Sequence, residues 1–176
     1  MKRKWTLGAL LMMAGIGISP AMAAGNLVRF DGGIGVIPVS SGVGTDPTAT
    51  VVNRNIVRTV QPPGNIWVIR DLKATVKDDG HILVDGRGLL LGGGNGVGGT
   101  AGQSVFATLI CEAAAPFTLS STPRTGVLLE PDGDFRIDDV LTPEVQGSVL
   151  PAECASPVLL IRNGAGAWFA AGIPVR

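Results

Sequence analysis

The chain has 176 residues, and its 14 basic and 14 acidic side chains cancel to no net charge. A nearly neutral, evenly mixed composition gives no electrostatic basis for binding nucleic acid or an anionic membrane surface. The two cysteines and one histidine are spaced as in no zinc motif, which argues against a zinc site.

Residues 1–23 have the three parts of a bacterial secretory signal peptide. A basic head at 2–4 precedes an uncharged apolar run at 6–18 and the small-x-small pattern of a cleavage site at 21–23. The apolar run is too short to cross a membrane comfortably as a helix. We expect cleavage after Ala23, a periplasmic or secreted location, and one soluble domain over 24–176. Losing three basic residues leaves 11 against 14 acidic ones. A retained N-terminal anchor is the alternative.

The first predicted strands of the mature chain are short. Asn26–Phe30 is expected to form a strand, Asp31–Gly33 a turn, and Ile34–Val39 a second strand. Pro38 cannot donate a ladder hydrogen bond, so the second strand should lie at a sheet edge. Thr48–Val60 is rich in β-branched residues around a polar centre, which predicts a strand with a bulge or an exposed section.

The clearest pattern lies at Ile66–Val84. Side chains alternate along residues 66–77, and one expected face carries Ile66, Val68, Arg70, Leu72, Ala74 and Val76. The turn Asp78-Asp79-Gly80 and a second apolar run complete a predicted β-hairpin at the centre of the sheet. Arg70-Asp71 and Asp85 with Arg87 are expected to form cross-strand ion pairs on the sheet surface.

The most biased segment is the glycine-rich stretch Gly92–Gly99. Glycine amides can approach an anion closely, so a loop that holds a phosphate or sugar is one interpretation. The stretch lacks a GxxxxGK[ST] pattern and is followed by no long amphipathic helix. A flexible connection between strands is the favoured interpretation.

The rest of the chain predicts further short strands and no helix of normal length. These strands are expected within Gln103–Glu112, Phe117–Ser121, Gly126–Glu130 and Pro131–Leu141, followed by a hairpin of Pro157–Asn163 and Ala167–Val175. About nine to eleven short strands at this spacing indicate an all-β fold. We expect a β-sandwich of immunoglobulin-like or jelly-roll type, with a small β-barrel as the alternative.

Cys111 and Cys154 are the two cysteines of the chain. Export would place them where disulfides persist, so we expect a Cys111–Cys154 bridge that stabilises the fold by roughly 4 kcal/mol on the chain-entropy model. Two free buried thiols are the alternative.

Asp132, Asp134, Asp138 and Asp139 form the best metal candidate, a structural calcium site. Their spacing is similar to half of an EF-hand loop. Phe135 stands where such a loop needs glycine, and Leu141 stands where it needs an acidic residue. A solvated turn is the alternative, and no other cofactor is expected.

Two further residue types could carry chemistry. His81 follows the turn of the central hairpin and could act as a general base beside an aspartate, although a solvated turn residue is the favoured interpretation. Trp67 and Trp168 could form a platform for a sugar, but each begins an apolar strand, which favours core packing.

The sequence therefore predicts a non-catalytic exported protein, with a structural, surface-associated or binding role in the cell envelope or extracellular space. Its partner would be a protein or another envelope component, and strand-to-strand association is expected around Pro38 and Val51–Val60. One alternative is a glycan- or calcium-dependent ligand-binding module, and a second is a hydrolase that uses His81.

Overall fold

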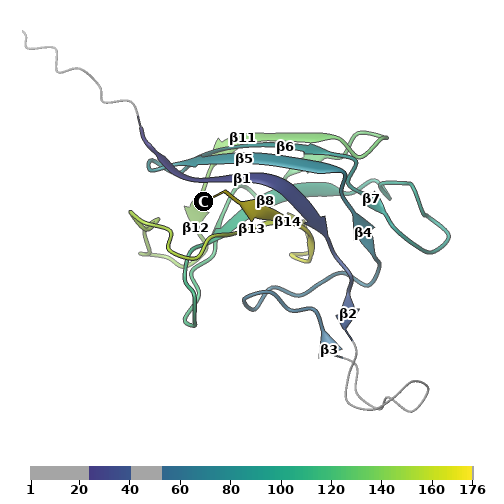
Figure 1. Ribbon diagram of the computed structural model, residues 1–176, viewed down its shortest axis with the longest axis horizontal. Helices are drawn as coiled ribbons and strands as arrows, with labels where there is room; N and C mark the ends of the chain where they lie inside the picture. The colour runs from purple at the N-terminus through teal and green to yellow at the C-terminus, as the bar shows by residue number, and fades with distance from the viewer. Residues whose placement is uncertain (1–23, 41–52, 176) are drawn as a thin grey trace, which may run out of the picture.

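The computed structural model describes residues 24–40 and 53–175, and all regular structure within these ranges is β-strand (Figure 1). The predicted signal peptide and residues 48–52 of a predicted strand lie outside these ranges. No helix in the described ranges is long and apolar enough to span a membrane.

The described ranges contain fourteen strands, several of them only two residues long. They are β1 (Asn26–Gly35), β2 (Val39–Ser40), β3 (Asn53–Arg54), β4 (Trp67–Val68), β5 (Asp71–Lys77), β6 (His81–Arg87), β7 (Leu90–Leu91), β8 (Ser104–Ile110), β9 (Ser120–Ser121), β10 (Val127–Leu128), β11 (Phe135–Val140), β12 (Thr142–Pro143), β13 (Val158–Asn163) and β14 (Trp168–Pro174).

Ten of these strands form one antiparallel sheet in the order β11-β6-β5-β1-β14-β13-β8-β9-β12, with β10 also paired to β8. Because β11 and β12 are separated only by Leu141, the two ends of this path meet and the sheet nearly closes on itself. In Figure 1, β11, β6, β5 and β1 lie above β8, β13 and β14. The predicted all-β fold is confirmed, and a nearly closed sheet fits either a sandwich or a small barrel.

Strand β1 joins the two layers. Its first part pairs with β5 and its last part with β14, and the register shifts between Phe30 and Gly33. The turn predicted at Asp31–Gly33 is therefore wrong, because these residues form an irregularity inside one strand. Gly32 has φ +95°, a conformation that glycine adopts without a Cβ penalty.

The central hairpin is confirmed as β5 and β6, joined by a turn at Asp78–Gly80. The single long strand expected before it is wrong, because the pairing stops between β4 and β5. Leu72 is buried as expected, but Trp67 is buried and Val68 exposed, so the inward face reverses across the break. Trp67 stacks on Phe169 with ring centroids 4.0 Å apart, and β4 pairs with β7 in a separate small sheet.

The core is one apolar cluster drawn from both layers. The second predicted hairpin, β13 and β14, is also confirmed, and its residues Leu159–Ile161 and Phe169 belong to this core. β13 pairs with β8 along its whole length, from Val158 opposite Ile110 to Asn163 opposite Val105. This long pairing fixes which polar side chains meet on the outside of β8 and β13.

Candidate functional site

Within the described ranges, the buried polar side chains come from β8, from β9 and the residue after it, and from β13. They are Thr108, Ser120, Ser121, Thr122 and Arg162. Ser120 stands opposite the core residue Leu109, whereas Thr108, Ser121 and Arg162 meet on the other face of the sheet. Phe106 on the same face is fully buried but lies outside the apolar core cluster. A buried polar side chain is costly unless it is hydrogen-bonded, so its partners show what the site is built to do.

Arg162 connects these groups through a continuous network. Its Nη1 donates to Glu144 Oε1 at 3.0 Å and to Thr108 Oγ1 at 3.1 Å, and its Nε donates to the carbonyl of Gly166 at 2.9 Å. Ser121 Oγ donates to the same oxygen of Glu144 at 2.7 Å and lies 2.8 Å from Thr108 Oγ1. We call Thr108, Ser121, Arg124, Glu144 and Arg162 the Arg162 cluster.

Arg124 completes the cluster at its rim. Its Nη2 lies 2.9 Å from Glu144 Oε2, so both oxygens of this carboxylate face an arginine. The guanidinium groups of Arg124 and Arg162 lie 5.9 Å and 5.1 Å from the centroid of the Phe106 ring. The surface beside them is a depression of about 370 Å³ lined by Ser121–Arg124, Asp139–Val140 and Thr142–Glu144.

The electrostatics of the Arg162 cluster favour a fixed ion pair. Burial acts to raise the pKa of the Glu144 carboxyl, but the Ser121 hydrogen bond and the charges of Arg162 and Arg124 hold the pKa below its usual value. Burial also lowers the pKa of Arg162, and the charge of Glu144 opposes that shift. A carboxylate with a lowered pKa and both oxygens engaged is a poor general base for Ser121.

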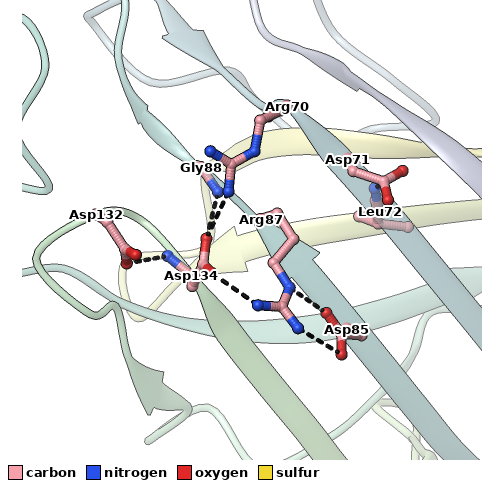
Figure 2. Close-up of polar contacts among 8 residues, drawn as sticks. All are labelled: Arg70, Asp71, Leu72, Asp85, Arg87, Gly88, Asp132 and Asp134. Carbon is pink, nitrogen blue, oxygen red and sulfur yellow. Dashed lines mark hydrogen bonds and ion pairs between the residues drawn. The ribbon is translucent and has the colours of Figure 1, made fainter.

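A second polar cluster lies around Asp134, just before β11 (Figure 2). Asp134 accepts hydrogen bonds from the backbone N–H of Gly88 at 2.9 Å and from Arg87 Nη1 at 2.9 Å, with Arg70 at 3.4 Å. Arg87 also pairs with Asp85 at 2.7 Å. We call Arg70, Asp85, Arg87, Gly88 and Asp134 the Asp134 cluster. Asp85 and Arg87 do pair, but within β6 and not across strands, and Arg70 pairs with Asp134, so the expected cross-strand pairing is wrong.

The four aspartates of the predicted calcium site are directed to different partners. Asp132 accepts the backbone N–H of Asp134, Asp138 pairs with His81 and Arg136, and Asp139 accepts the backbone N–H of Val140. Within the described ranges, no three His, Cys, Asp or Glu side chains are grouped as metal ligands. The calcium hypothesis stays a prediction without an assembled ligand set.

His81 lies beside Asp138, with Nε2 3.0 Å from Oδ1. The His81 and Asp138 side chains are 41% and 53% exposed, so the pair sits on an open sheet surface. The histidine–aspartate pair that the hydrolase hypothesis requires is therefore present. No hydrogen bond among the described residues brings a nucleophilic side chain to this pair, so the hydrolase hypothesis stays a prediction.

Trp67 and Trp168 are both buried, at 3% and 4% exposure. Trp168 donates its ring N–H to the carbonyl of Asn55 at 3.0 Å, and Trp67 stacks on Phe169. The predicted core packing of both tryptophans is confirmed, and neither presents an open face for a sugar.

The glycine-rich stretch Gly92–Gly99 folds on itself beyond β7. The amides of Val97, Gly98 and Gly99 donate to carbonyls of Gly94, Leu91 and Gly96. Because these amides already have partners inside the loop, they do not point together toward an anion. The interpretation as a connection between strands fits this geometry.

The predicted disulfide between Cys111 and Cys154 is confirmed. Cys111 directly follows β8, and Cys154 lies in the connection before β13. Neither the Arg162 cluster nor the role of Arg58, which binds beside this disulfide, was predicted from the sequence. The available signal was an arginine at the end of the apolar run Val158–Ile161.

Comparisons of the chain with protein-family models, curated proteins and solved structures found no match.

Proposed function

We propose that this is an exported bacterial protein with a structural or binding role in the cell envelope or extracellular space, and with no catalytic role. The observation that carries the proposal is the state of the Arg162 cluster. Its carboxylate is held by two arginines and a hydroxyl, and Arg162 also ties β13 to Thr108 of β8. Such a network stabilises a surface and leaves no group free to act as base or nucleophile.

Binding is supported by the apolar surface at one end of the molecule. Among the residues that the structure describes, six of the thirteen exposed large apolar side chains lie at the end of β1, in β2, and in segments at β3 and β4. They are Ile34, Ile37, Val39, Ile56, Ile66 and Val68. The end of β1 lies directly against β4. The two backbones are so close that a Cβ at Gly35 would clash with the backbone of Trp67 and Val68. We call these six residues the apolar end. Exposed apolar groups that gather in this way are typical of interaction surfaces.

The short sheets at this end leave strand edges for a partner to pair with. Within the described ranges β2 pairs with β3 and β4 with β7, each in a narrow two-stranded sheet, and on the other side of β4 the Trp67 amide donates to the Val36 carbonyl (Figure 1). An extended partner segment could add to such an edge through main-chain hydrogen bonds. This fits the strand-to-strand association expected around Pro38.

The test is a capture experiment with the mature protein and its own cell envelope and culture medium. Ile37→Asp and Val68→Asp place a charge on the apolar end, and Thr75→Asp places one on the charged face of β5 as the control. We expect the first two variants to lose captured components that the wild type and the control retain. Equal capture by all four proteins, or hydrolysis of envelope material by the wild type, would contradict the proposal.

A further inference from the structure

Beside the disulfide, the side chain of Arg58 makes a group of hydrogen bonds to the loops that carry the two cysteines. Arg58 Nη1 donates to the carbonyl of Ile110 at 3.0 Å and to the carbonyl of Ser156, and its Nη2 donates to Ser156 Oγ at 2.7 Å. Ile110 precedes Cys111, and Ser156 lies two residues after Cys154. The Ser156 amide also donates to the Cys111 carbonyl at 3.1 Å. Arg58 therefore binds backbone on both sides of the disulfide.

The turn that presents Arg58 is strained. Val57 and Val60 exchange two backbone hydrogen bonds around it, as in a two-residue hairpin. Such a turn needs positive φ at both central residues, which normally selects asparagine and glycine. Here Arg58 has φ +45° and Thr59 has φ +74°. A β-branched residue in this conformation is a true outlier, and it persists only where its surroundings hold it.

The surroundings that hold the turn are the loops joined by the disulfide. Besides its three hydrogen bonds there, the guanidinium lies 5.8 Å from the centroid of the Phe117 ring. The neighbouring Glu112 has a buried carboxylate oxygen, Oε2, with no hydrogen-bond partner among the described residues. The contacts of Arg58 depend on the spacing between the two loops. That spacing is held by the disulfide together with the Ser156–Cys111 backbone hydrogen bond and the Val158–Ile110 end of the β8–β13 ladder.

The two cysteines differ in their exposure to solvent. Cys111 is buried at 7% exposure, whereas Cys154 is half-buried and lines an open cleft of about 390 Å³. The other walls of the cleft are Leu27–Val28, Ala155–Pro157 and Pro174–Val175. An incoming thiolate can approach Cys154 through this cleft, while Cys111 is covered.

We propose that the Cys111–Cys154 disulfide is a thiol-exchange site whose reduction releases Arg58 and, with it, the segment 53–60 beside the apolar end. A thiolate of an external dithiol attacks Cys154 Sγ, the Cys111–Cys154 S–S bond breaks, and Cys111 leaves as a thiolate that takes up a proton. The second thiol of the dithiol then attacks the mixed disulfide, which frees Cys154. The two electrons come from the dithiol, which ends as a cyclic or protein disulfide.

The consequence for residues 53–60 follows from how they are held. Without the disulfide the two loops can move apart beyond the end of the β8–β13 ladder. Arg58 then keeps partners on one side at most, and the positive φ values of Arg58 and Thr59 are no longer compensated. Val57 and Val60, which pack against or within the core, then become accessible next to Ile56. Reduction would thus change the surface to which the proposed partner binds, although the exchange chemistry does not depend on that partner.

The first experiment measures hydrogen exchange of the oxidised mature protein with and without dithiothreitol. We expect exchange in residues 53–60 to accelerate by about tenfold or more while β5 and β6 keep their protection, as in a local opening. Unchanged exchange in 53–60 would overturn the proposal. Loss of protection across β5 and β6 as well would also overturn it, since that result means global unfolding.

The second experiment keeps the disulfide intact. Arg58→Gln should reproduce the accelerated exchange of residues 53–60 in the oxidised protein, and Arg136→Gln, which removes an exposed arginine of β11, should not. If Arg58→Gln exchanges like the wild type, Arg58 does not hold the segment and the proposal fails.

The third experiment tests the direction of attack. The oxidised protein is treated with glutathione, quenched in acid and mapped by mass spectrometry. We expect the mixed disulfide on Cys154, and a majority on Cys111 would contradict the access argued from the cleft.

Discussion

The Arg162 cluster and the Asp134 cluster each pair two arginines with carboxylates, but they are held together differently. Arg162 is 7% exposed and its cluster joins side chains to side chains across β8, β9 and β13 and to Glu144 after β12. In the Asp134 cluster Arg87 is 51% exposed, and Asp134 is fixed by the backbone amide of Gly88. The comparison indicates that buried charge pairs contribute to holding strands together. Where the arginines are exposed, the hydrogen bond to the backbone does more to fix the structure than the charge pairs.

The largest expected effect breaks the backbone that supports the Asp134 cluster. Gly133 has φ +82°, and a Cβ there would lie 2.6 Å from the backbone nitrogen of Leu89. We expect Gly133→Ala to lower the free energy of unfolding by about 3 kcal/mol, measured by urea denaturation.

Gly94→Ala is the matched control, because Gly94 also has positive φ but open space around it. Gly94→Ala should lower the free energy of unfolding by about 1 kcal/mol, which is the cost of placing an alanine at positive φ without a steric clash. Equal losses for the two variants would mean that the close packing of Gly133 on Leu89 contributes nothing.

The next largest effect is expected from a side-chain substitution that disrupts the Arg162 cluster. Arg162→Met removes the donor to Glu144, Thr108 and Gly166, and should lower the free energy of unfolding by about 2–3 kcal/mol. Arg124→Met removes the arginine at the rim, whose side chain is 55% exposed, and should cost about 0.5–1 kcal/mol. The urea concentrations at which the two variants are half unfolded provide the test. If Arg124→Met is destabilised more than Arg162→Met, burial of the arginine does not determine how much it contributes to stability.

A smaller effect is expected from pH. Because the folded-state pKa of Glu144 lies below its unfolded value, the contribution of Glu144 to stability is complete above the unfolded value. It is lost as the pH falls from about 4.5 through the folded-state pKa. Glu144→Gln should therefore lose less stability than the wild type between neutral and acidic pH in parallel urea titrations. Parallel pH profiles would show that Glu144 is not held by its arginines.

The smallest effect concerns the exposed charges of the Asp134 cluster. Asp134→Asn keeps an acceptor for the Gly88 amide but removes the charge that faces Arg70 and Arg87. We expect a smaller loss of stability than for Arg162→Met, and one that disappears between about 0.05 M and about 1 M salt. The Arg162→Met effect should persist at the higher salt. If salt does not reduce the loss of stability in Asp134→Asn, the charges of the Asp134 cluster are less solvated than their exposure indicates.

Local patterns in the sequence predict the parts of the fold that local interactions determine. The β5–β6 and β13–β14 hairpins follow from alternation around glycine turns, and the disulfide follows from two cysteines in a chain with a predicted export signal. Trp67 was expected in the core and is there, but the reversal of faces beside it depends on tertiary packing against Phe169, which alternation does not encode.

The candidate site could not be predicted because register brings it together. Arg162 stands opposite Phe106 in the β13–β8 ladder, and Glu144 arrives from the connection after β12. The turn predicted at Asp31–Gly33 failed for a related reason. A glycine pair between apolar runs is equally compatible with a turn and with a bulge, and the partners β5 and β14 decide between them.

The position of β1 has a consequence for when the protein can fold. Its last residues pair with β14, so that Gly33 meets Gly172, about 140 residues further along the chain. Contacts this distant in sequence are slow to form because a long loop must close first. During synthesis the sheet cannot close until β14 has been made. If the exported chain that we propose crosses the membrane while it is being made, β1 reaches the new compartment before its partner β14.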